Sequence, residues 1–377
     1  MYLEELKLMN FRNYDSLELK LNPHINIIYG NNAQGKTNLL ESIYVLGLTK
    51  SHLFNLDSNL IKDDTSLCKI KGKYRKEKIK TILEIELNLN QKRMLIDKEE
   101  TKKVSNYIQS SLNLIVFYPE DLEIIKGTPS ARRNFINLEL SQLSNNYLKI
   151  LNEYNKLLKI RNDYLKKMSK NISIDETYFE IITNYLVDKS LLLYKMRLKF
   201  IEQLNINCGR IFKEITKLDG FCIKYFPNYI FSDNIEDFKI NLFEKYQKNK
   251  VKEVRFGTTL YGPHRDEIEF YINDRNLKNY GSQGQKRLAI LSTKLAEIDI
   301  FRKYKNTNPI LLLDDIFSEL DDIKKNKIIN FISNDIQVII TTTELKKINK
   351  NKFENVSVFK IKNGEIIKSK EVEKDGK

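Results

Sequence analysis

Cysteine and histidine are scarce in this sequence, which has 377 residues and only three of each. The cysteines, Cys68, Cys208 and Cys222, lack the spacing of a metal site or a disulfide framework. With so few histidines, a structural zinc site is not expected either. No apolar run approaches the roughly 18 residues of a transmembrane helix, and the acidic, alternating start Met1–Glu5 is unlike a signal peptide. The sequence therefore predicts a reduced, soluble, cytoplasmic protein with no membrane partner.

The length of 377 residues suffices for two or three domain-sized units. The formal net charge is +14 and the pI is about 9.3, which favours a polyanionic partner such as nucleic acid. Lysine, asparagine and isoleucine are abundant throughout, so a solvated lysine surface arising from a general bias is the alternative. Charge alone leaves both interpretations open.

A phosphate-binding P-loop is indicated by the spacing of Gly30, Gly35, Lys36 and Thr37, between an apolar strand Ile25–Tyr29 and an amphipathic helix. Glycine permits backbone angles that a Cβ penalises, so successive N–H groups can converge on phosphate oxygens. Lys36 supplies a charge for the β- and γ-phosphates, and Thr37 a hydroxyl for Mg²⁺. The alternative is an ordinary tight turn. The predicted nucleotide-binding residues of the loop are Gly30, Asn31, Asn32, Ala33, Gln34, Gly35, Lys36 and Thr37.

A Walker B strand is predicted at Ile310–Leu313, because this apolar run ends in two acids. Asp314 is expected to bind the metal with Thr37, and Asp315 to position or deprotonate the attacking water. Lys36, Asp314 and Asp315 are thus the candidate catalytic residues. The alternative is that the two acids cap the next helix.

Tyr280–Gln285 opens a helix and resembles the signature motif of ABC-type ATPases. There the serine, the glycine and the helix N-terminus form an anion site over the γ-phosphate bound by a second subunit. Ser282, Gln283, Gly284 and Gln285 are the matching residues, and Gln283 stands where that class usually has glycine. Ser318–Asp321 matches the dimer-contacting D-loop. Thr341–Thr343 falls where transporters carry a switch histidine, which argues against a transporter subunit.

Hydrophobic periodicity divides the chain into three parts. Alternating hydrophobicity predicts strands in residues 1–29 and again in residues 67–96. The strands in 67–96 are expected to form a β-meander. From Ser130 the spacing becomes helical, and Tyr178–Leu218 is a second helical run. Asn363-Gly364 indicates a type I′ turn in a closing hairpin. These helices carry clustered bases, including Arg161 and Arg197, most simply interpreted as an exposed face. The expected parts are an N-terminal half of an ATPase lobe at 1–125, a helical insert at 126–254 and a C-terminal half at 255–377.

These stretches together resemble the RecF family of bacterial recombinational-repair ATPases, which is related to the SMC proteins. The matching segments are Asn10–Tyr14, Gly30–Thr37, Thr49–His52, Phe117–Leu122, Lys126–Gly127 with Arg132–Arg133, Gly262–Asp266, Tyr280–Gln285, Leu311–Asp321 and Thr341–Thr343. The resemblance implies an α/β fold: an ABC-type ATPase head, with a mixed sheet, flanking helices and an antiparallel β-meander, plus an inserted helical lobe.

The resemblance also implies a function in recombinational repair and replication restart. An ATP-dependent homodimer would bind single-stranded and gapped duplex DNA and, with RecO/RecR-type mediators, promote recombinase loading and SOS induction. ATP and Mg²⁺ are the implied cofactors. Asp315 stands where most ABC enzymes have glutamate, and its shorter reach predicts slow hydrolysis suited to a switch. The rival interpretations are a transporter subunit and a degenerate ATPase that serves as a structural DNA-binding module.

Two of the matching segments have open roles. After Ser51 and His52 the family tends to be basic, whereas Leu53 and Phe54 are apolar, so the sequence leaves a DNA contact there open. Gly262–Asp266 has no function that its residues indicate. A structural turn held by an ion pair is one interpretation of this segment, and an unassigned functional role is the other.

Overall fold

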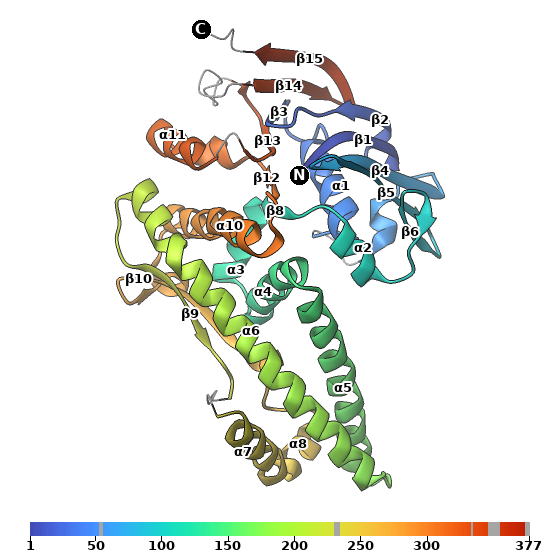
Figure 1. Ribbon diagram of the computed structural model, residues 1–377, viewed down its shortest axis with the longest axis vertical. Helices are drawn as coiled ribbons and strands as arrows, with labels where there is room; N and C mark the ends of the chain where they lie inside the picture. The colour runs from blue at the N-terminus through green and yellow to red at the C-terminus, as the bar shows by residue number, and fades with distance from the viewer. Residues whose placement is uncertain (53–55, 230–233, 333–334, 346–354, 374–377) are drawn as a thin grey trace. The chain divides into compact units, whose positions relative to one another are not determined.

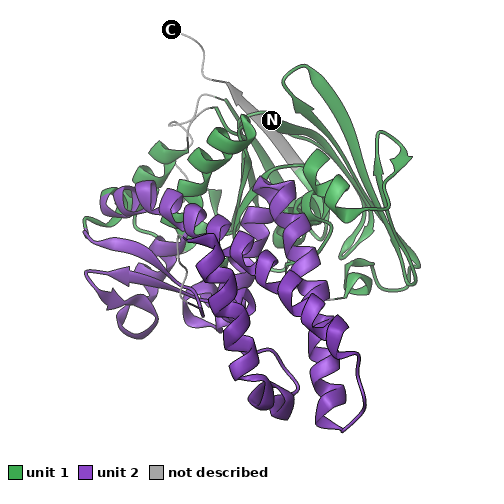
Figure 2. Ribbon diagram, turned by 60° about the horizontal axis from the view of Figure 1, so that its bottom comes forward, with its two compact units in different colours: residues 1–121, 214–217, 291–377 green, residues 122–213, 218–290 purple. Residues whose placement is uncertain are grey.

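The structure is a computed structural model that describes residues 1–52, 56–229, 234–332, 335–345 and 355–373 (Figure 1). The chain forms two compact units (Figure 2). The first unit comprises residues 1–121, 214–217 and 291–377, and the second comprises 122–213 and 218–290. Among the described residues, no helix is long and apolar enough to cross a membrane. The cysteines Cys68, Cys208 and Cys222 are free.

The first unit contains a six-stranded, mostly parallel sheet in the order β15-β14-β3-β13-β12-β8. Its central strands read as continuous apolar runs because both faces are buried, as in β12 with its sequence ILLL and β8 with LIVF. The strands are β3 (Ile25–Tyr29), β8 (Leu114–Phe117), β12 (Ile310–Leu313), β13 (Val338–Thr342), β14 (Asn355–Lys362) and β15 (Glu365–Glu373). Helices α1 (Lys36–Leu48) and α11 (Asp322–Phe331) follow β3 and β12.

A second six-stranded sheet in the same unit is antiparallel, in the order β2-β1-β4-β5-β6-β7. Buried and half-exposed residues alternate along β4, so one face packs on the core and the other is wet. The wet face carries a ladder of cross-strand ion pairs, including Lys71–Glu84 and Arg93–Glu86. Its elements are β1 (Tyr2–Phe11), β2 (Tyr14–Lys20), β4 (Leu67–Lys76), β5 (Ile79–Asn88), β6 (Lys92–Ile96) and β7 (Glu99–Glu100), with α2 (Val104–Ser110) after them. The meander predicted at 67–96 is confirmed.

The second unit is built on long helices and a small antiparallel sheet, β11-β10-β9. The helical pattern from Ser130 and the second run from Tyr178 correspond to α4, α5 and α6. The helices are α3 (Leu122–Lys126), α4 (Pro129–Leu143), α5 (Asn145–Ser169), α6 (Glu176–Thr216), α7 (Ile235–Lys248), α8 (Lys250–Phe256), α9 (Leu277–Tyr280) and the start of α10 (Gln283–Lys305). The strands are β9 (Phe221–Phe226), β10 (Glu267–Ile272) and β11 (Arg275–Asn276).

The compact units divide the chain differently from the expected three parts. The first boundary falls at 121/122 rather than at 125/126, and the second at 290/291 rather than at 254/255. The physical reason for the second difference is strand pairing, since β10 pairs antiparallel with β9 along its whole length. Residues 267–272 therefore share a sheet with residues 221–226, and the inserted unit is not purely helical. Short 3-10 turns complete the fold: η1 (Asp57–Leu60), η2 (Pro119–Asp121), η3 (Pro263–Arg265) and η4 (Ile316–Glu319).

Candidate nucleotide-binding site

The loop between β3 and α1 depends on its two glycines for different reasons. Gly35 has a φ of 106°, in the left-handed region, and is the residue before α1. Gly30 does not have a positive φ, so the expectation that it needs unusual backbone angles was wrong. Its requirement is close approach, because a Cβ on Gly30 would lie 2.4 Å from the carbonyl oxygen of Ile361. Ala33, with a φ of 61°, is the other residue of this loop in the left-handed region.

Lys36 is held inside the loop that it follows. Its side chain is only 7% exposed, and its Nζ donates to the carbonyl oxygens of Gly30 at 2.8 Å and Asn31 at 2.7 Å. Burial lowers the pKa of Lys36, while the charges of Asp315 and Asp314 act against that lowering. Because an ammonium group has three donors, the two carbonyls fix its position and leave a donor for a phosphate oxygen.

Thr37 and Asp314 meet at the end of the parallel sheet. The Thr37 hydroxyl donates to Oδ2 of Asp314 at 2.8 Å, and the Thr341 hydroxyl donates to Oδ1 of the same carboxylate. Burial raises the pKa of Asp314, and these two hydrogen bonds oppose that rise. Hydroxyl and carboxylate oxygens are the hard ligands that Mg²⁺ prefers, so the pair fits the metal role predicted for it.

Asp315 lies one residue beyond Asp314 in a strained conformation, with a φ of 45° that is uncommon for a non-glycine residue. Its N–H donates to the Thr341 hydroxyl at 3.0 Å. Its Oδ1 is buried and has no hydrogen-bond partner among the described residues. A buried carboxylate oxygen without a partner is costly, which suits a group that receives a hydrogen bond from a substrate water.

The turn between β14 and β15 is hydrogen-bonded to the phosphate-binding loop, a contact that the sequence did not reveal. The N–H groups of Asn363 and Gly364 donate to Oε1 and the carbonyl oxygen of Gln34 at 2.7 and 3.1 Å. Both turn residues have positive φ, 51° and 77°, as the Asn-Gly pair predicted for a type I′ turn. A cavity of about 680 Å³ lies between loop and turn, lined by Gly30, Asn31, Gln34, Lys360 and Lys362 among others.

Ser51 and His52 contact helix α1 and the residue after β8 rather than lying on an open face. The His52 ring stacks on Tyr118 with centroids 3.5 Å apart, and burial lowers the pKa of His52 to about 3. Tyr118 follows Phe117, which is in register with Leu313 just before Asp314. The Ser51 hydroxyl donates to buried Glu41 at 2.5 Å. Leu53 and Phe54, for which the sequence leaves a DNA contact open, lie outside the described residues.

The signature residues belong to the second unit, whereas the P-loop and the Walker B acids belong to the first. Ser282 and Gln285 form a reciprocal capping box: the Ser282 N–H donates to the Gln285 side chain at 2.8 Å, and the Gln285 N–H to the Ser282 hydroxyl at 3.2 Å. Gln283 is exposed and begins α10. Gly284 is exposed, and beyond its chain neighbours and its own helix backbone no atom of the described residues lies within 4 Å of the position a Cβ would take.

A P-loop after β3, an acidic pair after β12 and an adjoining antiparallel sheet define an ABC-type ATPase head. The model of the RecF/RecN/SMC N-terminal domain family matches residues 2–367. Two relatives carry the name DNA replication and repair protein RecF. The one from Latilactobacillus sakei subsp. sakei (strain 23K) is 39% identical over 97% of this chain and 99% of its own length. The one from Listeria innocua serovar 6a is 38% identical over 98% and 100%. The chain belongs to the RecF family.

Solved structures agree with this assignment. The recombination mediator protein RecF with ATP, in the RecFOR pathway, has a TM-score of 0.88 and 31% identity, covering 97% of this chain and 96% of its own. An Smc head bound to the C-winged helix domain of ScpA has a TM-score of 0.56 and 16% identity, covering 99% and 98%. The second likeness concerns the fold alone.

Proposed function

We propose that this chain binds ATP with Mg²⁺ at the P-loop and hydrolyses it slowly. The observation that carries the proposal is the 2.8 Å contact between Thr37 and Asp314, which joins the loop to the Walker B strand. Lys36 binds the β- and γ-phosphates, Thr37 and Asp314 hold the metal, and Asp315 orients the attacking water. When bound, Mg²⁺ neutralises charge on the phosphates. A related RecF has been solved with ATP, which supports the same ligand here.

The proposed ATP-bound state is a homodimer with two composite sites. Ser282, Gln283, Gly284 and Gln285 of one copy close over the γ-phosphate held by the other copy. The surroundings of Gly284 support this role, because apart from its chain neighbours and its own helix backbone no described residue has an atom within 4 Å of where its Cβ would be. A glycine that its own fold does not require is suited to close approach by another molecule. The capping box between Ser282 and Gln285 orients the N-terminus of α10, which favours an anion.

The dimer is proposed to hold single-stranded and gapped duplex DNA in the cytoplasm and to act with RecO/RecR-type mediators. Recombinase loading and SOS induction are its proposed outcomes, in keeping with the name of its relatives and with the RecFOR pathway named for a related structure. The net charge of +14 supports a polyanionic partner, and affinity is expected to fall steeply with salt. ATP hydrolysis removes the bridging charge and opens the dimer, so ATP serves as a switch.

Gel filtration with ATP or ADP, with and without gapped duplex DNA, tests the proposal. The expected result is a dimer with ATP and a monomer with ADP, and the ATP dimer carries DNA. A monomer in every condition would overturn the clamp. The matched variant is Lys36→Arg, which keeps the charge but not the compact ammonium held by Gly30 and Asn31. It should still bind nucleotide yet hydrolyse it poorly, and wild-type turnover in Lys36→Arg would contradict the P-loop assignment.

ATP turnover with and without gapped DNA separates the switch from a degenerate ATPase that only binds DNA. Measurable turnover that DNA changes supports the switch. Turnover that is absent in both conditions, with DNA still bound, identifies a structural module instead.

A further inference from the structure

The turn at Gly262–Asp266 in the second unit presents one side chain to solvent. Gly262 has a φ of 127°, and Pro263–Arg265 form the 3-10 turn η3. Pro263 and Asp266 are buried and His264 is mostly so, whereas Arg265 is exposed. The fold therefore holds this turn from inside and directs Arg265 outward.

Asp266 anchors the turn on its C-terminal side. Its fully buried carboxylate accepts from Nη1 of Arg197 at 2.6 Å and from the Tyr225 hydroxyl. The Asn228 N–H donates to its other oxygen at 2.9 Å. Arg197, which the helical pattern suggested was exposed, is only 2% exposed and also donates to the carbonyl of Pro263 at 2.7 Å. Burial raises the pKa of Asp266, and the charge of Arg197 opposes the rise.

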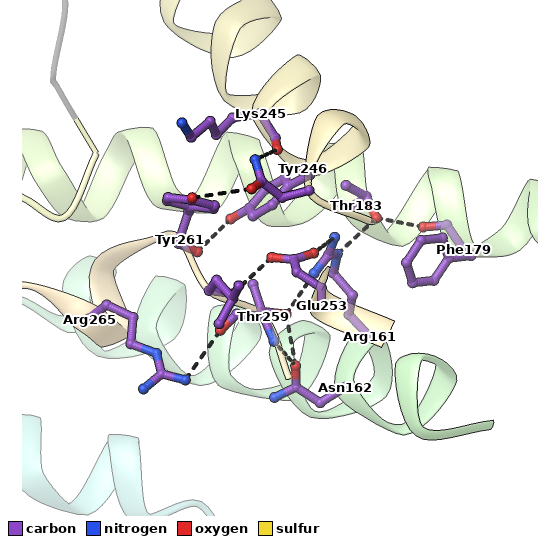
Figure 3. Close-up of polar contacts among 12 residues, drawn as sticks. Arg161, Asn162, Phe179, Thr183, Lys245, Tyr246, Glu253, Thr259, Tyr261 and Arg265 are labelled. Carbon is purple, nitrogen blue, oxygen red and sulfur yellow. Dashed lines mark hydrogen bonds and ion pairs between the residues drawn. The ribbon is translucent and has the colours of Figure 1, made fainter. Parts of the chain in front are cut away.

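Arg161 and Glu253 anchor the chain that leads into the turn (Figure 3). Both are buried and their side chains lie 2.7 Å apart, so Arg161 is a second base that the pattern wrongly placed on an exposed face. Arg161 also donates to the Thr259 hydroxyl at 2.7 Å. His264 completes the anchor: its Nε2 lies 3.0 Å from the Thr259 carbonyl, so it donates there, and its Nδ1 accepts from the Tyr154 hydroxyl at 2.6 Å.

A second arginine, Arg133 of helix α4, contacts the same turn. Nη1 of Arg133 donates to the carbonyl oxygen of Asp266, the residue after Arg265, at 2.9 Å. Burial and the charge of Arg197 lower the pKa of Arg133. The charge of Arg265 lowers it further, whereas the charges of Asp266 and Glu267 raise it. Within the described ranges, neither the guanidinium group of Arg133 nor that of Arg265 forms an ion pair, and Nη2 of Arg265 lies 3.5 Å from the carbonyl oxygen of Thr259. Their neighbour Arg132, by contrast, is paired with Glu267 at 2.6 Å.

We propose that Arg133 and Arg265 together bind a phosphate group of a nucleic-acid backbone. Arg133 contacts the turn that carries Arg265, and neither guanidinium group forms an ion pair within the described ranges. A bound anion at this turn is therefore attracted by both charges. The planar fork of arginine matches phosphate oxygens in pairs. The anchored turn fixes Arg265 before binding, so little side-chain freedom is lost in the complex. The assignment rests on the DNA binding proposed above and names a surface for it.

Arg133 and Arg265 are a better candidate for a phosphate contact than the solvent-exposed face of the antiparallel sheet. There the bases already have partners, such as Arg93 with Glu86 and Glu100 at 3.0 and 3.1 Å. A phosphate would have to displace those carboxylates, whereas in the described part of the second unit Arg133 and Arg265 donate only to the neutral backbone carbonyls of Asp266 and Thr259. The same contrast supplies a matched control, because Arg93 is an exposed arginine whose charge is already compensated.

The experiment measures binding of the full-length protein with ATP to a fluorescent gapped duplex, over a series of salt concentrations. The variants are Arg265→Ala and Arg133→Gln, which keeps a donor for the Asp266 carbonyl, with Arg93→Ala as the control. We expect each test variant to bind roughly tenfold more weakly, and the slope of log affinity against log salt to fall by about one. Arg93→Ala should change both quantities little. ATP turnover without DNA should stay at the wild-type rate in all three variants.

The outcomes separate this site from the proposed function. If the wild type binds the duplex but Arg265→Ala and Arg133→Gln keep its affinity and salt slope, the phosphate site is overturned while DNA binding stands. If the wild type binds no DNA with ATP, the proposed function fails and the site with it. Melting with inorganic phosphate identifies the source of the anion. Inorganic phosphate could raise the melting temperature of the wild type more than that of Arg265→Ala while the two proteins bind DNA with equal affinity. That result would overturn the assignment to nucleic acid.

Discussion

The hydroxyl of Thr37 lies 2.8 Å from Oδ2 of Asp314, although 277 positions separate the two residues in the sequence. The parallel sheet makes this contact possible, because β13 lies between β3 and β12 and pairs with both in parallel. The carboxyl ends of these strands therefore share one edge, where the loop after β3 meets the acids after β12. The contact turns two separate sequence motifs into one site.

Thr341 is the residue through which both Walker B acids are held. Its hydroxyl donates to Asp314 and accepts from the Asp315 N–H. Thr341→Val keeps the shape but removes both bonds, so we expect ATP turnover to fall about tenfold, the value of one charged hydrogen bond of about 1.5 kcal/mol. Nucleotide affinity should change less, because Lys36 is untouched. Thr341→Ser is the control, and a Ser variant as slow as the Val variant would show that packing, not the hydroxyl, matters.

Asp315 is expected to limit the rate of hydrolysis by its short reach. Its buried Oδ1 has no partner among the described residues, so the carboxylate is placed to receive a water but sits one methylene further back than glutamate would. Asp315→Glu should raise the turnover number several-fold, whereas Asp315→Asn should lower it at least as strongly because the base is lost. Single-turnover ATP hydrolysis measures both. A glutamate variant with unchanged or lower turnover would refute the reach argument.

The P-loop and the Walker B strand could be predicted from the sequence because each is a local pattern. Strand, glycine spacing and helix are contiguous at Gly30–Thr37, and Ile310–Leu313 with its two acids is contiguous as well. The Asn363–Gly364 turn was predicted for the same reason. That this turn clasps Gln34 could not be, because the contact follows from β14 pairing in parallel with β3, and no local signal encodes which strands become neighbours.

Arg161 and Arg197 show a second limit of periodicity. Each lies on a long helix among lysines, so the pattern suggests a solvated face. Each is instead buried against an acid from a distant segment, Glu253 and Asp266. A charged side chain is buried at acceptable free-energy cost only when it has such a partner. The sequence pattern around the arginine does not show which acid the fold will bring close. The boundary expected at 254/255 lies at 290/291 for a related reason, because β9 and β10 pair although they are far apart in the sequence.

Gly30 is predicted to tolerate no side chain. The Cβ of alanine there would lie 2.4 Å from the backbone oxygen of Ile361, so either the loop or β14 must move. Gly30→Ala should lower the free energy of unfolding by about 1–3 kcal/mol and weaken ATP binding. Gly284→Ala is the matched control, because space is open there and alanine is the better helix former. Thermal melting of both variants and nucleotide titration of Gly30→Ala check this, and equal melting temperatures would contradict it.

His52 is expected to make the protein sensitive to acid. Burial lowers its pKa from 6.5 to about 3, so the folded protein keeps the ring neutral while the unfolded chain takes up a proton below about pH 6.5. The folded state therefore loses stability as the pH falls through this window, by up to about 1.4 kcal/mol per pH unit, and the loss ends near the folded pKa. His264, with its pKa lowered to about 4, adds a loss of the same sign.

His52→Phe isolates the contribution of His52. Phenylalanine keeps a ring against Tyr118 and Tyr44 and removes only the titrating group. Melting temperatures of the two proteins, measured from pH 7.5 to 4.5, should diverge as the pH falls, because carboxylates and His264 titrate equally in both. The variant should be the less acid-sensitive of the two, since its unfolded state gains no proton at position 52. Parallel curves across this range would mean that His52 is protonated in the folded protein, and the stacked ring would then be an imidazolium rather than a neutral side chain.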